Sequence, residues 1–121
     1  MPTRLYSVVL DALAPHRLAE FWAVALGWCV GPVTSGEATM RAPWAPEQLP
    51  WGLLLQEVRE LKSGKNRLHL DLASESVEAQ RITVERLVGL GARPVDIGQG
   101  DVPWVVLTDP EGNELCVRPA R

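Results

Sequence analysis

Several features are scarce in this chain of 121 residues, and each absence excludes a class of protein. The only two cysteines, Cys29 and Cys116, are isolated and lack CxxC spacing, so neither a disulfide framework nor a zinc knuckle is expected. Lysine and arginine form no basic cluster and the net charge is -3, which argues against a nucleic acid partner. No apolar run approaches the roughly 20 residues of a transmembrane helix, and residues 1–4 lack the apolar start of a signal peptide. We therefore expect a soluble, cytoplasmic protein with free thiols and no membrane partner.

The composition favours a single compact domain. Hydrophobic residues make up 46% of the chain, and 121 residues can enclose one core but are too few for two ordinary domains. We expect one domain over residues 1–121. Arginine greatly outnumbers lysine and alanine is abundant, a coding bias typical of a GC-rich bacterial genome.

The first half of the chain predicts a strand, a helix and three further strands. Residues 5–12 are rich in β-forming side chains, and helical spacing follows in Leu18, Phe21, Trp22, Ala25 and Leu26. Pro15 suits the first turn of this helix, and Gly27 suits the position just past its end. Strand candidates separated by glycine and proline then occur at residues 29–33, 38–41 and 53–58.

The same order returns about sixty residues later. Residues 67–72 predict a strand, and one helical face carries Val77, Val84, Leu87 and Val88, with Gly91 ending the helix. Ser74 and Ser76 are alternative caps for its first turn. Strand candidates follow at residues 94–97, 104–108 and 114–118. The chain is thus an internal duplication of a βαβββ module, with module one at about 1–60 and module two at about 64–121.

The last two strand candidates are joined by a turn with a clear chemical signature. Asp109 can hydrogen-bond to the backbone ahead of it, Pro110 presets φ, and Gly112 accepts a positive φ. The segments on either side are therefore predicted to pair as a hairpin.

This hairpin and the duplication resemble the glyoxalase / bleomycin-resistance / extradiol dioxygenase superfamily, the vicinal oxygen chelate fold, and within it the small glyoxalase-like domains. The segments VVLDA (8–12), AEFW (19–22) and NRLHLDL (66–72) carry the same resemblance. It implies an α+β fold in which two βαβββ modules form a curved, mostly antiparallel sheet around a concave cavity, with the helices outside. It also implies a homodimer and a small organic ligand. The fold hosts lyases, isomerases, dioxygenases, transferases and non-catalytic drug binders, so it does not settle activity.

Strand alternation sorts the polar residues onto one face without reference to any family. Leu68, Leu70 and Leu72 are predicted to pack under the helices, which leaves Arg67, His69 and Asp71 on the other face. In the first strand Tyr6, Val8 and Leu10 are predicted to pack, and Ser7, Val9 and Asp11 oppose them. In the last strand Leu115 and Val117 pack, and Glu114, Cys116 and Arg118 oppose them.

The resemblance also implies positions for a metal site. The family's ligands come from the first, fourth, fifth and eighth strands, which correspond here to Ser7, Gln56 or Glu57, His69 and Cys116. A slip of two residues would bring Val9 or Asp11 to the place of Ser7. Cys116 stands where the family usually has glutamate, and a divalent metal needs three or four convergent ligands. We therefore expect no cofactor, with a divalent metal held by His69, Cys116 and Glu57 as the alternative.

Each candidate residue has a functional and a structural interpretation. Histidine titrates near neutrality, so His69 is the candidate general base and catalytic residue, or else a hydrogen-bonded strand residue. Cys116 is either an inert buried thiol or a nucleophile. Asp11 and Asp71 either orient His69 or bind a ligand's cation, or they are solvated or paired with arginine.

The five tryptophans divide by context. Trp22 and Trp28 are predicted to be structural, and Trp104 to wall the cavity. Trp44 and Trp51 flank a proline-rich loop that is either a lid over the site or a dimer seam.

Together these features predict a small-molecule-binding protein with a degenerate metal site, whose ligand is an aromatic or antibiotic-like metabolite. The predicted ligand-binding residues, besides His69, are Asp11, Gln56, Asp71, Trp104 and Cys116. Two enzymatic alternatives remain: metal-free acid–base chemistry by His69, or a lyase, isomerase or dioxygenase reaction at a divalent ion. A scaffold that binds partners through the tryptophan loop is the third class.

Overall fold

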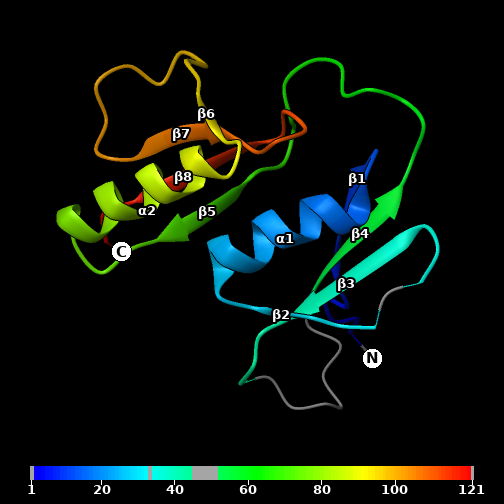
Figure 1. Cartoon of the computed structure of the whole chain (residues 1–121). Helices are drawn as coiled ribbons and strands as arrows, with labels where there is room; N and C mark the ends of the chain where they lie inside the picture. The colour runs from blue at the N-terminus through cyan, green and yellow to red at the C-terminus, as the bar shows by residue number, and fades with distance from the viewer. Residues whose placement is uncertain (1, 33, 45–51, 121) are drawn as a thin grey trace. The chain divides into compact units, whose positions relative to one another are not determined.

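The structure, a computed structural model, describes residues 2–32, 34–44 and 52–120 (Figure 1). The chain divides into two compact units, Met1–Leu61 and Lys62–Arg121. The first unit contains β1 (Val8–Ala12), α1 (Pro15–Leu26), β2 (Cys29–Val30), β3 (Glu37–Arg41) and β4 (Leu53–Glu57). The second contains β5 (Leu70–Ala73), α2 (Val77–Gly89), β6 (Arg93–Pro94), β7 (Val105–Thr108) and β8 (Glu114–Arg118).

Each unit has the predicted βαβββ order and folds into its own sheet. The strand orders are β1-β4-β3-β2 and β5-β8-β7-β6, so hydrogen bonding divides the strands into two open sheets of four. The first and last strands of each unit pair in parallel, and the remaining pairs are antiparallel. The predicted α+β class with duplicated modules is confirmed. That the two units act as one domain stays a prediction.

In the first unit α1 packs its apolar face onto the sheet. Leu18, Phe21 and Trp22 are at most 3% exposed, and the rings of Phe21 and Trp22 meet edge to face with centroids 5.6 Å apart. Pro15 begins the helix and Gly27 ends it with φ of 67°, in the left-handed region that glycine adopts without strain. The predicted bounds of this helix are confirmed.

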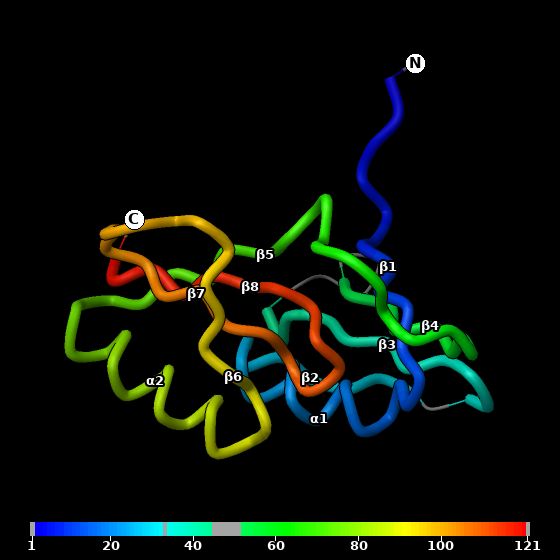
Figure 2. Tube along the Cα trace, turned by 90° about the horizontal axis from the view of Figure 1, so that it is seen from above, coloured from blue at the N-terminus to red at the C-terminus, as the bar shows by residue number. Residues whose placement is uncertain are grey.

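In the second unit α2 lies on one side of the strands, as Figure 2 shows from above. Leu87 is its buried apolar anchor, and Leu107, Leu115 and Val117 of the sheet are fully buried. Ser76 caps the helix by accepting a hydrogen bond from the Ala79 N–H at 3.1 Å, which decides between the two predicted caps.

The duplication is exact in the register of the parallel pairs. Asp11 lies opposite Gln56 in β1 and β4, and Asp71 lies opposite Cys116 in β5 and β8. Each residue of the second pair therefore stands 60 residues after its counterpart in the first. Counting back from Leu70 in this register makes Val9, and not Ser7, the counterpart of His69.

Two predicted strands start too early. β1 begins at Val8, and Tyr6, predicted to pack, is 67% exposed. β5 begins at Leu70, and Leu68, also predicted to pack, is 70% exposed. The ladder to β8 starts at the pair Leu70–Leu115, and ahead of it the Asn66 N–H bonds to a side chain instead of a strand. Tyr6 and Leu68 lie outside the ladders, so the pleated geometry that alternates side chains between the two faces of a strand does not direct them toward the core.

The predicted apolar face of α2 is also partly wrong. Val77 is 71% and Val88 is 42% exposed, whereas the polar Gln80 is buried. The helix ends at Gly89, two residues before the predicted Gly91. Because Gln80 donates to two backbone carbonyls beneath it, the polar contact sets which side of α2 meets the sheet.

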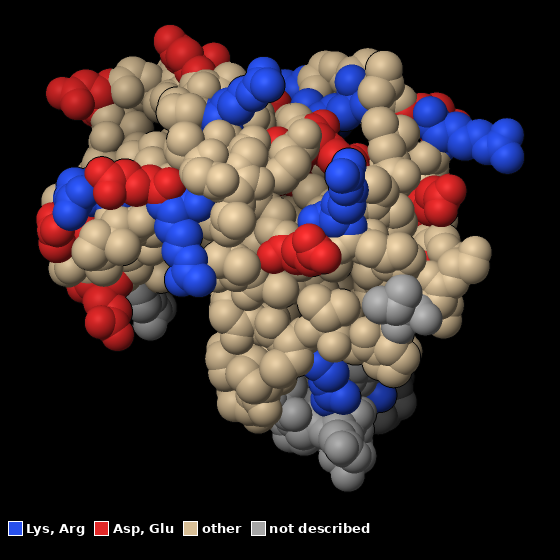
Figure 3. All heavy atoms as spheres, in the orientation of Figure 1, with Lys and Arg blue, Asp and Glu red and all other residues tan. Residues whose placement is uncertain are grey.

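Among the described residues, no helix combines the length and apolarity needed to cross a membrane. On the face drawn in Figure 3, acidic and basic side chains of the described residues are interspersed. Trp44 is 75% exposed, and the rest of the predicted tryptophan loop, including Trp51, lies outside the described residues.

Candidate functional site: a histidine, an aspartate and a cysteine on one sheet face

The parallel pair of β5 and β8 brings Asp71 and Cys116 together. They are direct partners in the ladder, so their side chains point to the same face of the sheet. Leu115 and Val117, the neighbours of Cys116 in β8, are fully buried on the face that carries α2. Alternation therefore places Asp71 and Cys116 on the face opposite the helix.

His69 completes the cluster from the residue before β5. Its Nε2 lies 3.0 Å from Asp71 Oδ1, and the two side chains are 38% and 47% exposed. The candidate ligand atoms of His69, Asp71 and Cys116 all lie within 4.8 Å of one another. The structure brings together His69, Asp71 and Cys116, which alternation placed on the polar faces of their strands. That Asp71 orients His69 stays a prediction.

The environment of Cys116 keeps its sulfur protonated. Burial, followed by the negative charge and hydrogen bonding of Asp71, raises the pKa of the Cys116 thiol to about 11, against smaller opposing effects of Arg118 and Lys65. Near neutral pH Cys116 is therefore a thiol that hydrogen-bonds to Asp71. This argues for the inert interpretation of Cys116 and against the nucleophilic one.

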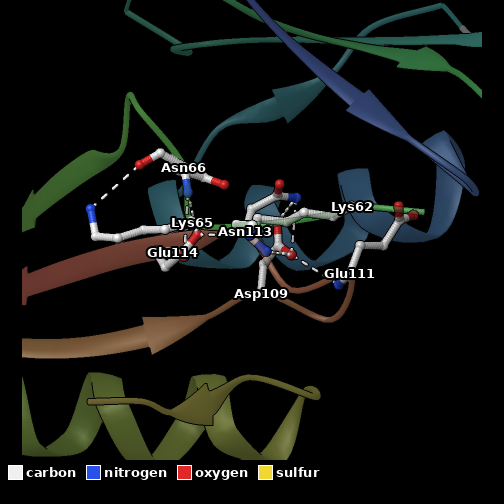
Figure 4. Close-up of polar contacts among 8 residues, drawn as sticks. Lys62, Lys65, Asn66, Asp109, Glu111, Asn113 and Glu114 are labelled. Carbon is white, nitrogen blue, oxygen red and sulfur yellow. Dashed lines mark hydrogen bonds and ion pairs between the residues drawn. The ribbon is translucent and has the colours of Figure 1, made fainter. Parts of the chain in front are cut away.

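The turn before β8 is fixed by one buried carboxylate, as Figure 4 shows. Asp109 Oδ1 accepts from the backbone N–H of Glu111 at 2.9 Å and of Asn113 at 3.0 Å. The Asn113 amide also donates to both carboxylate oxygens of Asp109. Gly112 takes φ of 92°, as the predicted turn requires. The turn thereby sets where β8, and with it Cys116, begins.

A second buried carboxylate ties the loop before His69 to the start of β8. Glu114 accepts hydrogen bonds from the Asn66 N–H, and Lys62 Nζ lies 3.2 Å from its Oε2 (Figure 4). Burial alone would raise the pKa of Glu114, but its own backbone N–H, Asn66 and Lys62 outweigh burial and lower it. Glu114 is thus a carboxylate that anchors the chain three residues ahead of His69.

Trp104 lies at the other end of the same strands, beside an arginine. The guanidinium carbon of Arg118 is 5.2 Å from the centroid of the Trp104 ring, within cation–π range. β7 begins at Val105, one residue later than predicted, so Trp104 precedes the strand. Both side chains are half-buried.

The remaining predicted site residues belong to the first unit. Asp11 and Gln56 are exposed and face each other across β1 and β4, and Glu57 follows Gln56 at the end of β4. Ser7 is half-buried and precedes β1. Val9, the counterpart of His69, has no ligand atom, and Gln56, the counterpart of Cys116, is a weak one. The duplication therefore did not preserve a metal-type donor set in the first unit at these positions.

The donor set of the second unit fits a divalent metal in chemistry, though loosely in spacing. Imidazole nitrogen, thiolate sulfur and carboxylate oxygen are all zinc ligands, and three protein donors leave a fourth position open, as in catalytic sites. Tetrahedral zinc would bring its donors to about 3.5 Å apart, closer than the 4.8 Å limit of the cluster. His69, Asp71 and Cys116 would hold such an ion after the thiol lost its proton.

Three residues at this site were not recognised as functional candidates from the sequence. Alternation placed Arg118 and Glu114 on the same face of the last strand as Cys116, but no local pattern shows what Arg118 or Glu114 contacts. Nothing in the sequence marks Gln80, whose amide reaches Pro103 and Val117 carbonyls at 2.9 Å each. Their roles depend on contacts between residues far apart in the chain.

Solved structures of the vicinal oxygen chelate class share this fold. A glyoxalase/bleomycin resistance protein/dioxygenase family enzyme from Burkholderia phytofirmans superposes with a TM-score of 0.73 at 14% identity, covering 93% of this chain and 94% of that one. The fosfomycin resistance protein FosX from Listeria monocytogenes, solved with Mn(II), gives 0.72 at 14% identity, covering 100% and 93%. A glyoxalase/bleomycin resistance protein from Albidiferax ferrireducens gives 0.65 at 17% identity, covering 93% and 95%. At these identities the likeness shows the fold alone.

Residues 7–118 match the family model described as a glyoxalase-like domain, so the chain belongs to that family. The predicted superfamily is confirmed. No curated protein matches the sequence significantly.

Proposed function

We propose that this protein binds a small organic molecule at the cluster of His69, Asp71 and Cys116, without a resident metal. The observation that carries the proposal is the contact of His69 Nε2 with Asp71 Oδ1 at 3.0 Å, beside a thiol whose pKa is raised to about 11. His69 and Asp71 are both part-exposed, so they can reach a ligand. The family membership supports a small-molecule role in general terms.

Within this proposal the three side chains form one hydrogen-bonding unit. Asp71 accepts from both neighbours, which fixes the orientation of the His69 ring and leaves its other nitrogen for a ligand. A ligand proton can then be exchanged with His69, so metal-free acid–base chemistry is open to the site. The protonated Cys116, whose one S–H donates to Asp71, lies beside the ligand position as an uncharged side chain.

A thermal-shift panel of aromatic metabolites and antibiotics tests the proposal. A compound that binds only native protein at 100 times its Kd stabilises it by about 2.7 kcal/mol, which is several degrees in Tm for a chain of this size. We expect such a shift in wild type and not in His69→Ala. His16→Ala is the matched control, because His16 is the other histidine of the chain and is exposed on α1. An equal shift in His69→Ala would refute the proposal.

The second candidate is a divalent-metal-dependent lyase, isomerase or dioxygenase, favoured by the convergence of nitrogen, oxygen and sulfur donors within 4.8 Å. A bound ion would polarise a ligand oxygen as a Lewis acid. The metal content of untagged protein, with melts against Zn²⁺, Ni²⁺, Mn²⁺ and Fe²⁺, distinguishes the two. A near-stoichiometric metal that His69→Ala loses and His16→Ala keeps would favour the second candidate.

The proposal also includes the assembly, a homodimer, and the compartment, the cytoplasm. Support comes from large apolar side chains exposed at the start of the first unit, with Leu5 60%, Tyr6 67% and Val9 50% exposed. Sedimentation equilibrium of wild type and of Tyr6→Ser tests the dimer. A monomeric wild type at micromolar concentration would rule it out.

A further inference from the structure

Arg118 presents an unused guanidinium on the face of the candidate site. It lies two residues after Cys116 in β8, so alternation puts both side chains on the face opposite α2. Among the residues that the structure describes, no carboxylate forms an ion pair with Arg118. A half-buried arginine with no carboxylate partner retains N–H donors for another anion.

The position of this guanidinium is fixed from two sides. The Trp104 ring lies under it at 5.2 Å, and the ladder of β7 with β8 ends at the pair Val105–Val117, the residues next to Trp104 and Arg118. The buried Gln80 amide holds the carbonyls of Pro103 and Val117, the residues directly before Trp104 and Arg118. A charged group held this way loses little conformational freedom when it binds.

The surrounding charges favour an anion. Arg118 and Lys65 both act on Cys116 to lower its pKa, which places two cations near the cluster. Asp71, the carboxylate of the cluster, already contacts His69 and Cys116. The cluster therefore has a cationic side that its own carboxylate does not neutralise.

We infer that Arg118 and Trp104 form the anion-binding subsite of this candidate site and that the ligand is a small aromatic carboxylic acid. The planar guanidinium matches a carboxylate in two parallel hydrogen bonds. The indole would hold the guanidinium in place, and the ligand's ring would extend from the guanidinium toward Asp71 and His69. This inference rests on the proposed function, because it names the ligand class of the same site.

Two probes of the same shape, the charged 2-naphthoate and the neutral 2-naphthamide, test the inference by calorimetry on the whole protein. Wild type is expected to bind the acid at least about 10-fold more tightly than the amide, the usual effect of a charge-assisted hydrogen bond. Arg118→Gln is expected to remove this preference without changing amide affinity. Arg86→Gln, the same charge change on exposed α2, is expected to leave both affinities unchanged. Salt should weaken the acid and not the amide.

The outcomes separate the subsite from the proposed function. Equal binding of acid and amide, both lost in His69→Ala, would overturn the subsite and keep the proposed function. A preference for the acid that survives Arg118→Gln would also overturn the subsite. No binding of either probe to wild type would overturn the inferred ligand class, while the thermal-shift panel decides the proposed function. If Arg118→Gln fails to fold, Arg118→Lys serves instead: it keeps the charge and stem but loses the planar fork, and is expected to lose a several-fold part of the preference.

Discussion

The reactivity of Cys116 offers a quantitative test of the cluster. The pKa of its thiol rises from a reference of 9.0 to about 11, chiefly through burial and then through Asp71. At 1.36 kcal/mol per unit this is about 2.7 kcal/mol in favour of the protonated form. The thiolate at pH 7.5 is thus about 100-fold rarer than for a reference thiol, at about 0.03% against 3%.

Alkylation by iodoacetamide, followed by mass spectrometry in a Cys29→Ser background, measures this directly. The rate should still be rising at pH 10 in wild type, because the thiolate is the reactive form. Asp71→Asn removes the charge next to the sulfur, so its profile should shift to lower pH and its rate at pH 8.5 should rise several-fold. Asp101→Asn is the control, an exposed carboxylate that does not act on Cys116. A wild-type profile that levels off below pH 9, or no change in Asp71→Asn, would refute the reasoning.

The same shift has a consequence for stability. The folded pKa of Cys116 lies above the unfolded one, so its contribution is complete below pH 9 and is lost as pH rises toward about 11. By pH 10.5 the free energy of unfolding of wild type should fall by about 2 kcal/mol because of this pKa difference. Urea unfolding of Cys116→Ala should lack this part of the slope, and identical slopes would contradict it.

Substitutions at three further residues test what holds the site in place. Glu114→Gln should lower the free energy of unfolding by about 1–3 kcal/mol at pH 7. Since the folded pKa of Glu114 is lowered, its contribution to stability is present above about pH 4.5 and is lost as pH falls. Urea unfolding should therefore find a smaller difference between wild type and Glu114→Gln at pH 3.5. Gln80→Leu should cost about 1–3 kcal/mol in thermal melts, because two carbonyls lose their donor; an unchanged Tm would contradict the anchoring role. Asp109→Ala should cost about 3 kcal/mol by losing its hydrogen bonds in the turn, and Asp109→Asn less; equal losses would contradict this.

Local chemistry made several elements predictable. The bounds of α1 follow from apolar spacing between Pro15 and Gly27, and the hairpin follows from Asp109 and Gly112. β8 has the predicted bounds because the turn fixes its start. Alternation was also sufficient to place Asp71 and Cys116 on one face, since both lie inside strands.

The remaining features depend on contacts that local patterns do not contain. β5 starts late because Asn66 bonds to Glu114, 48 residues away in sequence. The side of α2 that meets the sheet is set by Gln80, which a hydrophobic pattern treats as solvent-facing. That Arg118 contacts Trp104, and no carboxylate among the described residues, becomes visible only when the register of β7 and β8 is known.

The most direct measurement is the NMR response of the two histidine rings of metal-free protein to the best compound from the thermal-shift panel. With only two histidines, His16 is an internal reference on α1 and His69 reports on the cluster. The proposal predicts that saturating compound shifts the imidazole signals of His69 and leaves those of His16 unchanged. Binding that leaves His69 unchanged, or that occurs only after a divalent metal is added, would contradict a metal-free small-molecule site at His69, Asp71 and Cys116.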